Sequence, residues 1–118
     1  MNTMRSTWFV LITLLTLSAG CLSHPKSDPL KDWQRYPSRN REQMSAAITA
    51  DYESYIYHLT PDEKRRVPGS NISYYWNTNG QKAVKISIPM NGIWREHVLI
   101  YNLDNERIKT HKYETGQQ

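Results

Sequence analysis

Hydrophobic and polar positions alternate over much of the last third of the chain, as in strands that bury one face of a sheet. Three polar segments interrupt the alternation, and each carries an Asn or Gly suited to a tight turn. They are residues 78–80, 90–92 and 103–105. The pattern therefore predicts four antiparallel strands that form a meander with three-residue hairpin loops.

Loop length fixes the register of a hairpin, that is, which residues face each other. Three-residue loops pair Tyr74 with Val84, Ile72 with Ile86, Ile88 with Trp94, Val84 with Val98, and Ile100 with Ile108. Two-residue loops would instead place Ile86 opposite His97 and Ile88 opposite Arg95. We therefore predict the three-residue register, in which Glu96 is the one misfit on an apolar inner face.

A helical pattern precedes the strands. From Asn40, which resembles the start of a capping box with Gln43, apolar residues recur at intervals of three and four. They are Met44, Ala47, Ile48, Tyr52, Tyr55, Ile56 and Leu59. A second short helical turn begins at Thr60-Pro61. The predicted fold class is α+β, with one main helix packed on a four-stranded antiparallel meander in two layers.

The amino terminus has the features of a targeting segment. Arg5 precedes ten uncharged residues, 8–17, and the small residues 18–20 lead to Cys21. This is the order of a secretory signal, and the uncharged stretch is shorter than the roughly 20 residues that span a bilayer. After Cys21, residues 22–39 contain three prolines and no helical or strand period, which is typical of a flexible tether.

We therefore predict three parts: a signal peptide over 1–20, Cys21 with a flexible tether over 21–39, and a small α+β domain over 40–118. Trp33 and Tyr36 are expected to mark where the tether docks on the domain.

Residues 17–21, Leu-Ser-Ala-Gly-Cys, resemble the lipobox of bacterial lipoproteins. In that class the cysteine is diacylated on sulfur and the signal is cut before it. The resemblance implies a lipid anchor on Cys21 and a domain in the periplasm. Because Leu22 rather than Asp follows the cysteine, it favours the outer over the inner membrane. The sequence departs from this pattern at Ser18, where Leu is commoner. One alternative is a secreted protein with a free cysteine, and another is a membrane anchor that is left uncut. The resemblance covers residues 1–22 only.

The composition of the chain excludes several kinds of site and limits the kinds of partner. The single cysteine excludes an intramolecular disulfide framework, a cysteine zinc cluster and a CxxC redox centre. The net charge of +4 would suggest nucleic acid as a partner for a cytosolic protein. A protein exported by the predicted signal peptide does not meet nucleic acid in the cytosol. The negative surfaces that we expect it to meet are acidic proteins, anionic headgroups and lipopolysaccharide phosphates.

The predicted register gathers basic and aromatic residues, and no carboxylate, on the outer face of the sheet. Tyr and Arg are enriched in binding hot spots, so we predict that this face contacts a partner; a merely solvated face is the alternative. The predicted binding residues are Tyr75, Lys85, Arg95, His97, Tyr101, Arg107, Lys109, His111 and Tyr113. The register also places His97 opposite His111, but with Lys85 nearby and no third ligand we expect neither a metal nor a cofactor.

No hydrolase, metalloprotease, phosphate-loop or dinucleotide motif is present in the sequence. Glu96 is a candidate buried acid, expected to pair with Lys82 or Lys112. We expect a lipid-anchored, non-catalytic binding protein of the cell envelope, of the immunity, inhibitor or accessory type, with an acidic protein partner. The alternatives are a structural accessory lipoprotein that binds anionic headgroups or lipopolysaccharide, and a small periplasmic enzyme.

Overall fold

The computed structural model describes residues 28–37 and 41–116, and the helices and strands given below lie in these ranges. The predicted signal peptide, Cys21 and the first residues of the predicted tether lie outside them. Helices and strands follow the order β1 (Gln34–Arg35), a 3-10 turn (Arg41–Gln43), α2 (Ala46–Tyr57), α3 (Pro61–Arg66), a 3-10 turn (Val67–Gly69), β2 (Asn71–Trp76), β3 (Lys82–Pro89), β4 (Ile93–Tyr101) and β5 (Arg107–Gly116).

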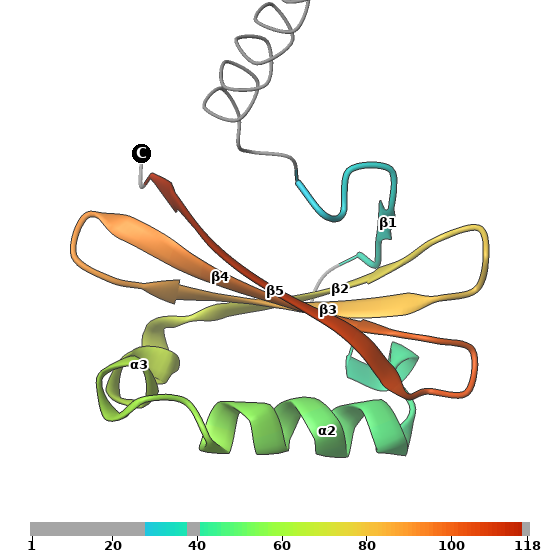
Figure 1. Cartoon of the computed structure of the whole chain (residues 1–118), viewed down its shortest axis with the longest axis horizontal. Coiled ribbons are helices and arrows are strands. Elements are labelled where there is room, and N and C mark those ends of the chain that lie inside the picture. Colours follow the sequence, from blue (N-terminus) through green and yellow to red (C-terminus); the bar gives the residue numbers. More distant parts are fainter. Residues whose placement is uncertain (1–27, 38–40, 117–118) are drawn as a thin grey trace, which may run out of the picture.

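The five strands form one antiparallel sheet in the order β1-β2-β3-β4-β5. Both helices lie on one side of this sheet, and the segment that contains β1 lies on the other (Figure 1). The α+β class is confirmed, although the sheet has five strands and two helices cover it. Within the described ranges, none of the helices is long and apolar enough to cross a membrane.

Side-chain caps define where the helices begin. The Ser45 hydroxyl accepts a hydrogen bond of 3.2 Å from the Ile48 amide, so α2 starts later than the predicted Asn40, which lies outside the described residues. Thr60 caps α3 as predicted, because its hydroxyl accepts from the Glu63 amide and Pro61 occupies the first helical position.

The main core lies between α2 and the sheet. Ile48 and Tyr52 of the helix pack with residues of β2, β3 and β4, among them Tyr74, Val84 and Leu99. The hydroxyls of Tyr52 and Tyr74 are 2.9 Å apart, so even this core contains a satisfied polar contact.

Two of the three predicted loops have the predicted length. In the β2–β3 loop, the Asn77 amide donates to the Gln81 carbonyl around a three-residue turn, and Gly80 has a φ of 86°. The β4–β5 loop repeats this arrangement with Asn102 and Glu106, and Asn105 has a φ of 63°. The β2–β3 register is therefore as predicted, with Tyr74 opposite Val84 and Ile72 opposite Ile86.

The predicted β3–β4 register is wrong by one residue. The Met90 amide donates to the Ile93 carbonyl at 2.8 Å, so the turn comprises only Asn91 and Gly92. Ile86 consequently lies opposite His97, the arrangement that was rejected on hydrophobic pairing. A shift of one residue turns every β4 side chain to the other face of the sheet. An irregularity between Ile100 and Tyr101 then changes the β4–β5 register.

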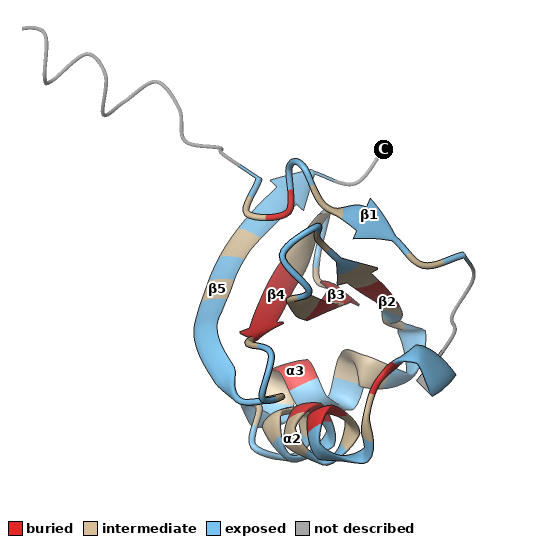
Figure 2. Cartoon of the chain, turned by 90° about the vertical axis from the view of Figure 1, so that its right-hand side faces the viewer, coloured by how far each residue is buried: buried red, intermediate tan, exposed pale blue. Residues whose placement is uncertain are grey.

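The shift is possible because both faces of the sheet are covered. Residues 28–36, here called the strap, cross the face opposite the helices: Leu30 is buried there against Ala83, Val98 and Ile100. β1 within the strap pairs with the end of β2. Figure 2 shows the buried parts of β3 and β4 between the helices and the strap. Residues 28–37 of the expected flexible tether are therefore part of the fold, with Trp33 and Tyr36 packed on the two cores.

Candidate functional site

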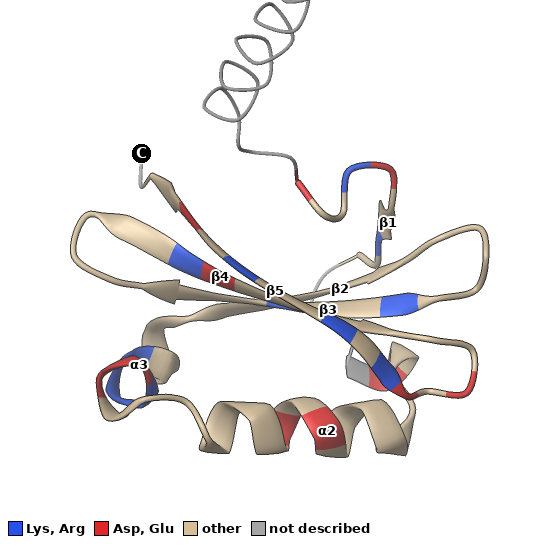
Figure 3. Cartoon of the chain, viewed as in Figure 1, with Lys and Arg blue, Asp and Glu red and all other residues tan. Residues whose placement is uncertain are grey.

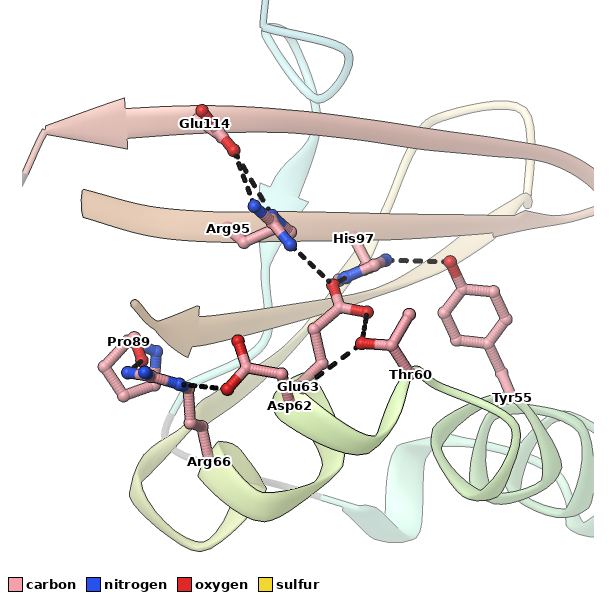
Figure 4. Close-up of polar contacts among 9 residues, drawn as sticks. All are labelled: Tyr55, Thr60, Asp62, Glu63, Arg66, Pro89, Arg95, His97 and Glu114. Atoms are coloured by element: carbon pink, nitrogen blue, oxygen red, sulfur yellow. Dashed lines mark hydrogen bonds and ion pairs between the residues drawn. The ribbon is translucent and has the colours of Figure 1, made fainter. Parts of the chain in front are cut away.

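The inner face of β4 carries polar groups that meet the helices. His97 is only 1% exposed, and its Nε2 lies 2.9 Å from Oε2 of Glu63, which is 2% exposed. Its Nδ1 lies 2.8 Å from the hydroxyl oxygen of Tyr55 on α2. Figure 4 shows this chain of three side chains, which joins α2, β4 and α3.

The partners of the ring determine where its proton lies. A carboxylate can only accept, so His97 Nε2–H donates to Glu63, and Nδ1 accepts from the Tyr55 hydroxyl. Burial lowers the pKa of His97 below its usual value of 6.5, although the Glu63 carboxylate acts in the opposite direction. The imidazole is therefore neutral at neutral pH.

Glu63 is held as a carboxylate. Its burial acts to raise its pKa, but hydrogen bonds from His97, Thr60 and Arg95 outweigh that effect and leave the pKa below its usual value. The Thr60 hydroxyl is 3.0 Å from Oε1, and Arg95 Nη1 is 3.4 Å from Oε2. Arg95 also binds Glu114 of β5 at 2.9 Å, which extends the network to the edge of the sheet (Figure 4).

A second polar contact joins α2 to the other end of β4. The Tyr101 hydroxyl donates to Asp51 Oδ2 at 2.6 Å, and Arg107 Nε lies 3.1 Å from the same oxygen. Burial, followed by the hydrogen bond to Asp51, raises the pKa of Tyr101, so this hydroxyl stays neutral. The guanidinium of Arg107 also lies over the ring of Tyr55.

A hydroxyl, an imidazole and a carboxylate in line are the components of a general-base relay. Here Tyr55 supplies the hydroxyl, and burial raises its pKa, as does the charge of Glu63. His97 and Glu63 are buried between the layers, and their hydrogen bonds are made within the fold. The three side chains therefore connect the sheet to α2 and α3.

Glu96 lies on the strap side of the sheet and is buried. Its carboxylate accepts hydrogen bonds from the Ser87 and Thr115 hydroxyls. The predicted partners of Glu96 are wrong, because Lys82 donates to the Gln43 carbonyl and Lys112 pairs with His97 in the strand register.

The nine predicted binding residues do not form one face. Four of them, Arg95, His97, Tyr101 and Arg107, face the helices. Glu63 of α3 binds Arg95 and His97, and Asp51 of α2 binds Tyr101 and Arg107. Tyr75 and Tyr113 pack against the strap. Burial, and then the nearby Asp28 and Glu96, raise the pKa of Tyr113 to about 12. Lys85, Lys109 and His111 remain on the outer face, and His111 pairs with Val98 rather than with His97.

Strand β5 was predicted, but its open edge was not included in the predicted binding surface. It is the last strand of the sheet, it is ten residues long, and most of its side chains are exposed. In the described ranges, its other side carries no strand, and Lys109 and Lys112 form no ion pair. Figure 2 shows it as a long exposed strand at the margin of the domain. The order of a meander already makes its last strand an edge, which is a signal present in the sequence.

An open depression of about 490 Å³ lies against this edge. Arg95, Lys112, Tyr113 and Glu114 line it. Arg95 is bound there to Glu114 and also to Glu63. Within the described ranges, Lys112 is therefore the cation of the depression that could pair with an anionic group.

Comparison with known proteins adds no relative: no family model, curated protein or solved structure matches this chain.

Proposed function

We propose that this protein is a lipid-anchored, non-catalytic binding protein of the cell envelope that contacts a protein partner along β5. The observation that carries the proposal is the exposed ten-residue edge strand with two lysines that lack an ion pair within the described ranges. An extended segment can add as a strand to an exposed sheet edge, and lysines on the edge disfavour pairing with a strand of like charge.

The state of the acid–base groups supports a non-catalytic role. Glu63 and His97 satisfy each other inside the fold, and the buried hydroxyl of Tyr101 donates to Asp51. A general base must reach the proton that it abstracts, and the burial of Glu63 and His97 between the layers keeps both from doing so.

The strap supports close attachment to a membrane. The resemblance of residues 17–21 to a lipobox places acyl chains on Cys21, and two or three such chains hold a protein stably on a bilayer. Asp28, where the described fold begins, follows Cys21 by seven residues, which span at most about 25 Å. The domain is thereby kept beside the headgroups, with β5 free at the margin of the sheet.

Two measurements test this function. Cys21→Ser should release the protein from membranes into the soluble fraction. A cross-linked pull-down from cell envelopes should recover one stoichiometric partner, and Lys109→Glu with Lys112→Glu should abolish its recovery. Lys64→Glu, which changes an exposed lysine on α3, should leave recovery intact. Retention of Cys21→Ser in membranes, or equal recovery by all variants, contradicts the proposal.

A second candidate function is adhesion to anionic headgroups or lipopolysaccharide. It is favoured by cations in the strap and on the strap side of the sheet, which include Lys31, Arg35, Lys85 and Lys109. Figure 3 shows Lys and Arg in the strap, in β3 and along β5. A Cys21→Ser protein that sediments with anionic vesicles, in a salt-dependent manner, would support it over the protein-binding function.

A further inference from the structure

We infer that β5 recognises an extended acidic segment of its partner, which adds to the sheet as a sixth strand and carries two carboxylates three residues apart. This inference rests on the proposed function and names the chemistry of the partner.

The backbone of β5 is held in the conformation that a further strand needs. Nine residue pairs, from Ile93–Gly116 to Tyr101–Arg107, join it to β4, which holds it extended over its length. A strand of ten residues is about 34 Å long, and its outer edge presents alternate amides and carbonyls. Addition of a strand to such an edge obtains its affinity from main-chain hydrogen bonds and its specificity from alternate side chains.

The charges of β5 select the occupant. Arg107 is bound to Asp51, and Glu114 is bound to Arg95, so both are satisfied within the domain. Lys109 and Lys112 form no ion pair with the rest of the described chain. A second copy of β5, in the antiparallel register that sets Lys109 opposite Lys112, would bring like charges together and destabilise strand pairing, whereas carboxylates would complement the lysines.

The register fixes the spacing of those carboxylates. Lys109 pairs with Ile100 and so lies on the strap side, while Lys112 pairs with His97 and lies on the helix side. Directly opposed residues of paired strands share a face, so the two partner residues that meet the lysines are three positions apart, one on each face. The carboxylate opposite Lys112 would enter the depression that Lys112 and Arg95 line.

A designed peptide tests the inference independently of any natural partner. The probe is a blocked, fluorescein-labelled decapeptide of alternating Thr and Val with Glu at its fourth and seventh positions. Binding to the purified protein in detergent is measured by anisotropy, and hydrogen exchange of residues 107–116 is followed by mass spectrometry. We expect saturable binding that slows exchange in β5, and about fivefold weaker binding for each of Lys109→Glu and Lys112→Glu. Lys64→Glu should match the wild type.

N-methylation of the peptide backbone separates strand addition from simple charge attraction. Methylation of one alternate set of residues removes the amides that face β5 and should weaken binding at least tenfold; methylation of the other set should change it little. Peptides with Lys in place of Glu, or with the two Glu residues two positions apart, should bind at least fivefold more weakly.

The possible outcomes distinguish this inference from the proposed function. Absence of binding, equal effects of the two methylated sets, or no slowing of exchange in β5 overturns the inference. If an envelope partner is still captured and its capture still depends on Lys109 and Lys112, the proposed function stands without strand addition. If no partner is captured but the peptide binds as described, the recognition mode stands and the proposed function fails.

Discussion

His97 Nε2 lies 2.9 Å from Glu63 Oε2, and both side chains are almost completely buried between β4 and α3. This contact allows β4 to turn polar side chains toward the helices, because each buried polar atom there receives a partner. It ties the short helix α3 to the sheet, together with Arg66, whose Nη1 donates to the Pro89 carbonyl at 3.4 Å (Figure 4).

Removal of the charge on Glu63 should destabilise the fold. Glu63→Gln keeps the volume of the side chain but replaces a carboxylate that accepts hydrogen bonds from His97, Thr60 and Arg95. We expect a loss of about 2–3 kcal/mol in the free energy of unfolding, measured by urea denaturation. Glu42→Gln, on an exposed residue, is the control and should change it by less than about 0.5 kcal/mol. Equal values for the two variants would contradict a central role of Glu63.

Acid should destabilise the protein in two stages. The pKa of His97 in the folded state lies below its usual 6.5, so between these values the unfolded chain binds more protons and stability falls as pH falls. The pKa of Glu63 lies below its usual 4.5, so its contribution is lost in turn as pH falls below 4.5. Urea denaturation from pH 7.5 to well below pH 4.5 measures both stages. His97→Gln should flatten the first stage; a wild-type protein that gains stability on acidification to pH 5.5 would show a protonated His97 paired with Glu63.

The hydroxyl of Tyr55 should stabilise the fold through His97. Tyr55→Phe leaves Nδ1 of His97 without its hydrogen bond, and we expect a cost of about 1 kcal/mol by thermal or urea unfolding. Tyr57→Phe is the matched control, because Tyr57 lies on the same helix and is 68% exposed. If Tyr57→Phe lowers the free energy of unfolding as much as Tyr55→Phe, the hydrogen bond from Tyr55 to His97 does not stabilise the fold.

The strap should contribute to the stability of the domain. Leu30→Ala removes a side chain that is 5% exposed and packed on Ala83, Val98 and Ile100. The expected cost is about 2–4 kcal/mol in the free energy of unfolding, as for other large-to-small changes in a core. Leu103→Ala, on an exposed leucine, should cost far less. A Leu30→Ala protein as stable as the wild type would mean that the strap is only a tether.

The fold class and much of β2 and β3 could be predicted from sequence because their rules are local. Thr60 with Pro61 marks a helix start, and the loops that end in Gly80 and Asn105 need a residue with positive φ. The β2–β3 register followed from one of these loops and from the pairing of Tyr74 with Val84.

The β3–β4 register could not be predicted in this way, since it depends on residues distant in sequence. Apolar pairing selects a register only where one face of a sheet is buried, whereas the strap buries the second face over Val98 and Ile100. In addition, His97 is satisfied inside the fold by Glu63, which lies 34 positions earlier in the chain, on another element. The candidate binding face failed for the same reason, as one wrong turn length moved Arg95, His97 and Tyr101 to the side of the helices.

Site-specific photo-cross-linking in intact cells tests the central claim, protein contact along β5, most directly. A photoreactive amino acid at Thr110, which lies exposed on β5, is compared with the same amino acid at Ala50, which lies exposed on α2. We predict one discrete protein adduct from Thr110, lost when Lys109 and Lys112 are changed to Glu, and none from Ala50. An adduct from Ala50 with none from Thr110 would contradict the claim.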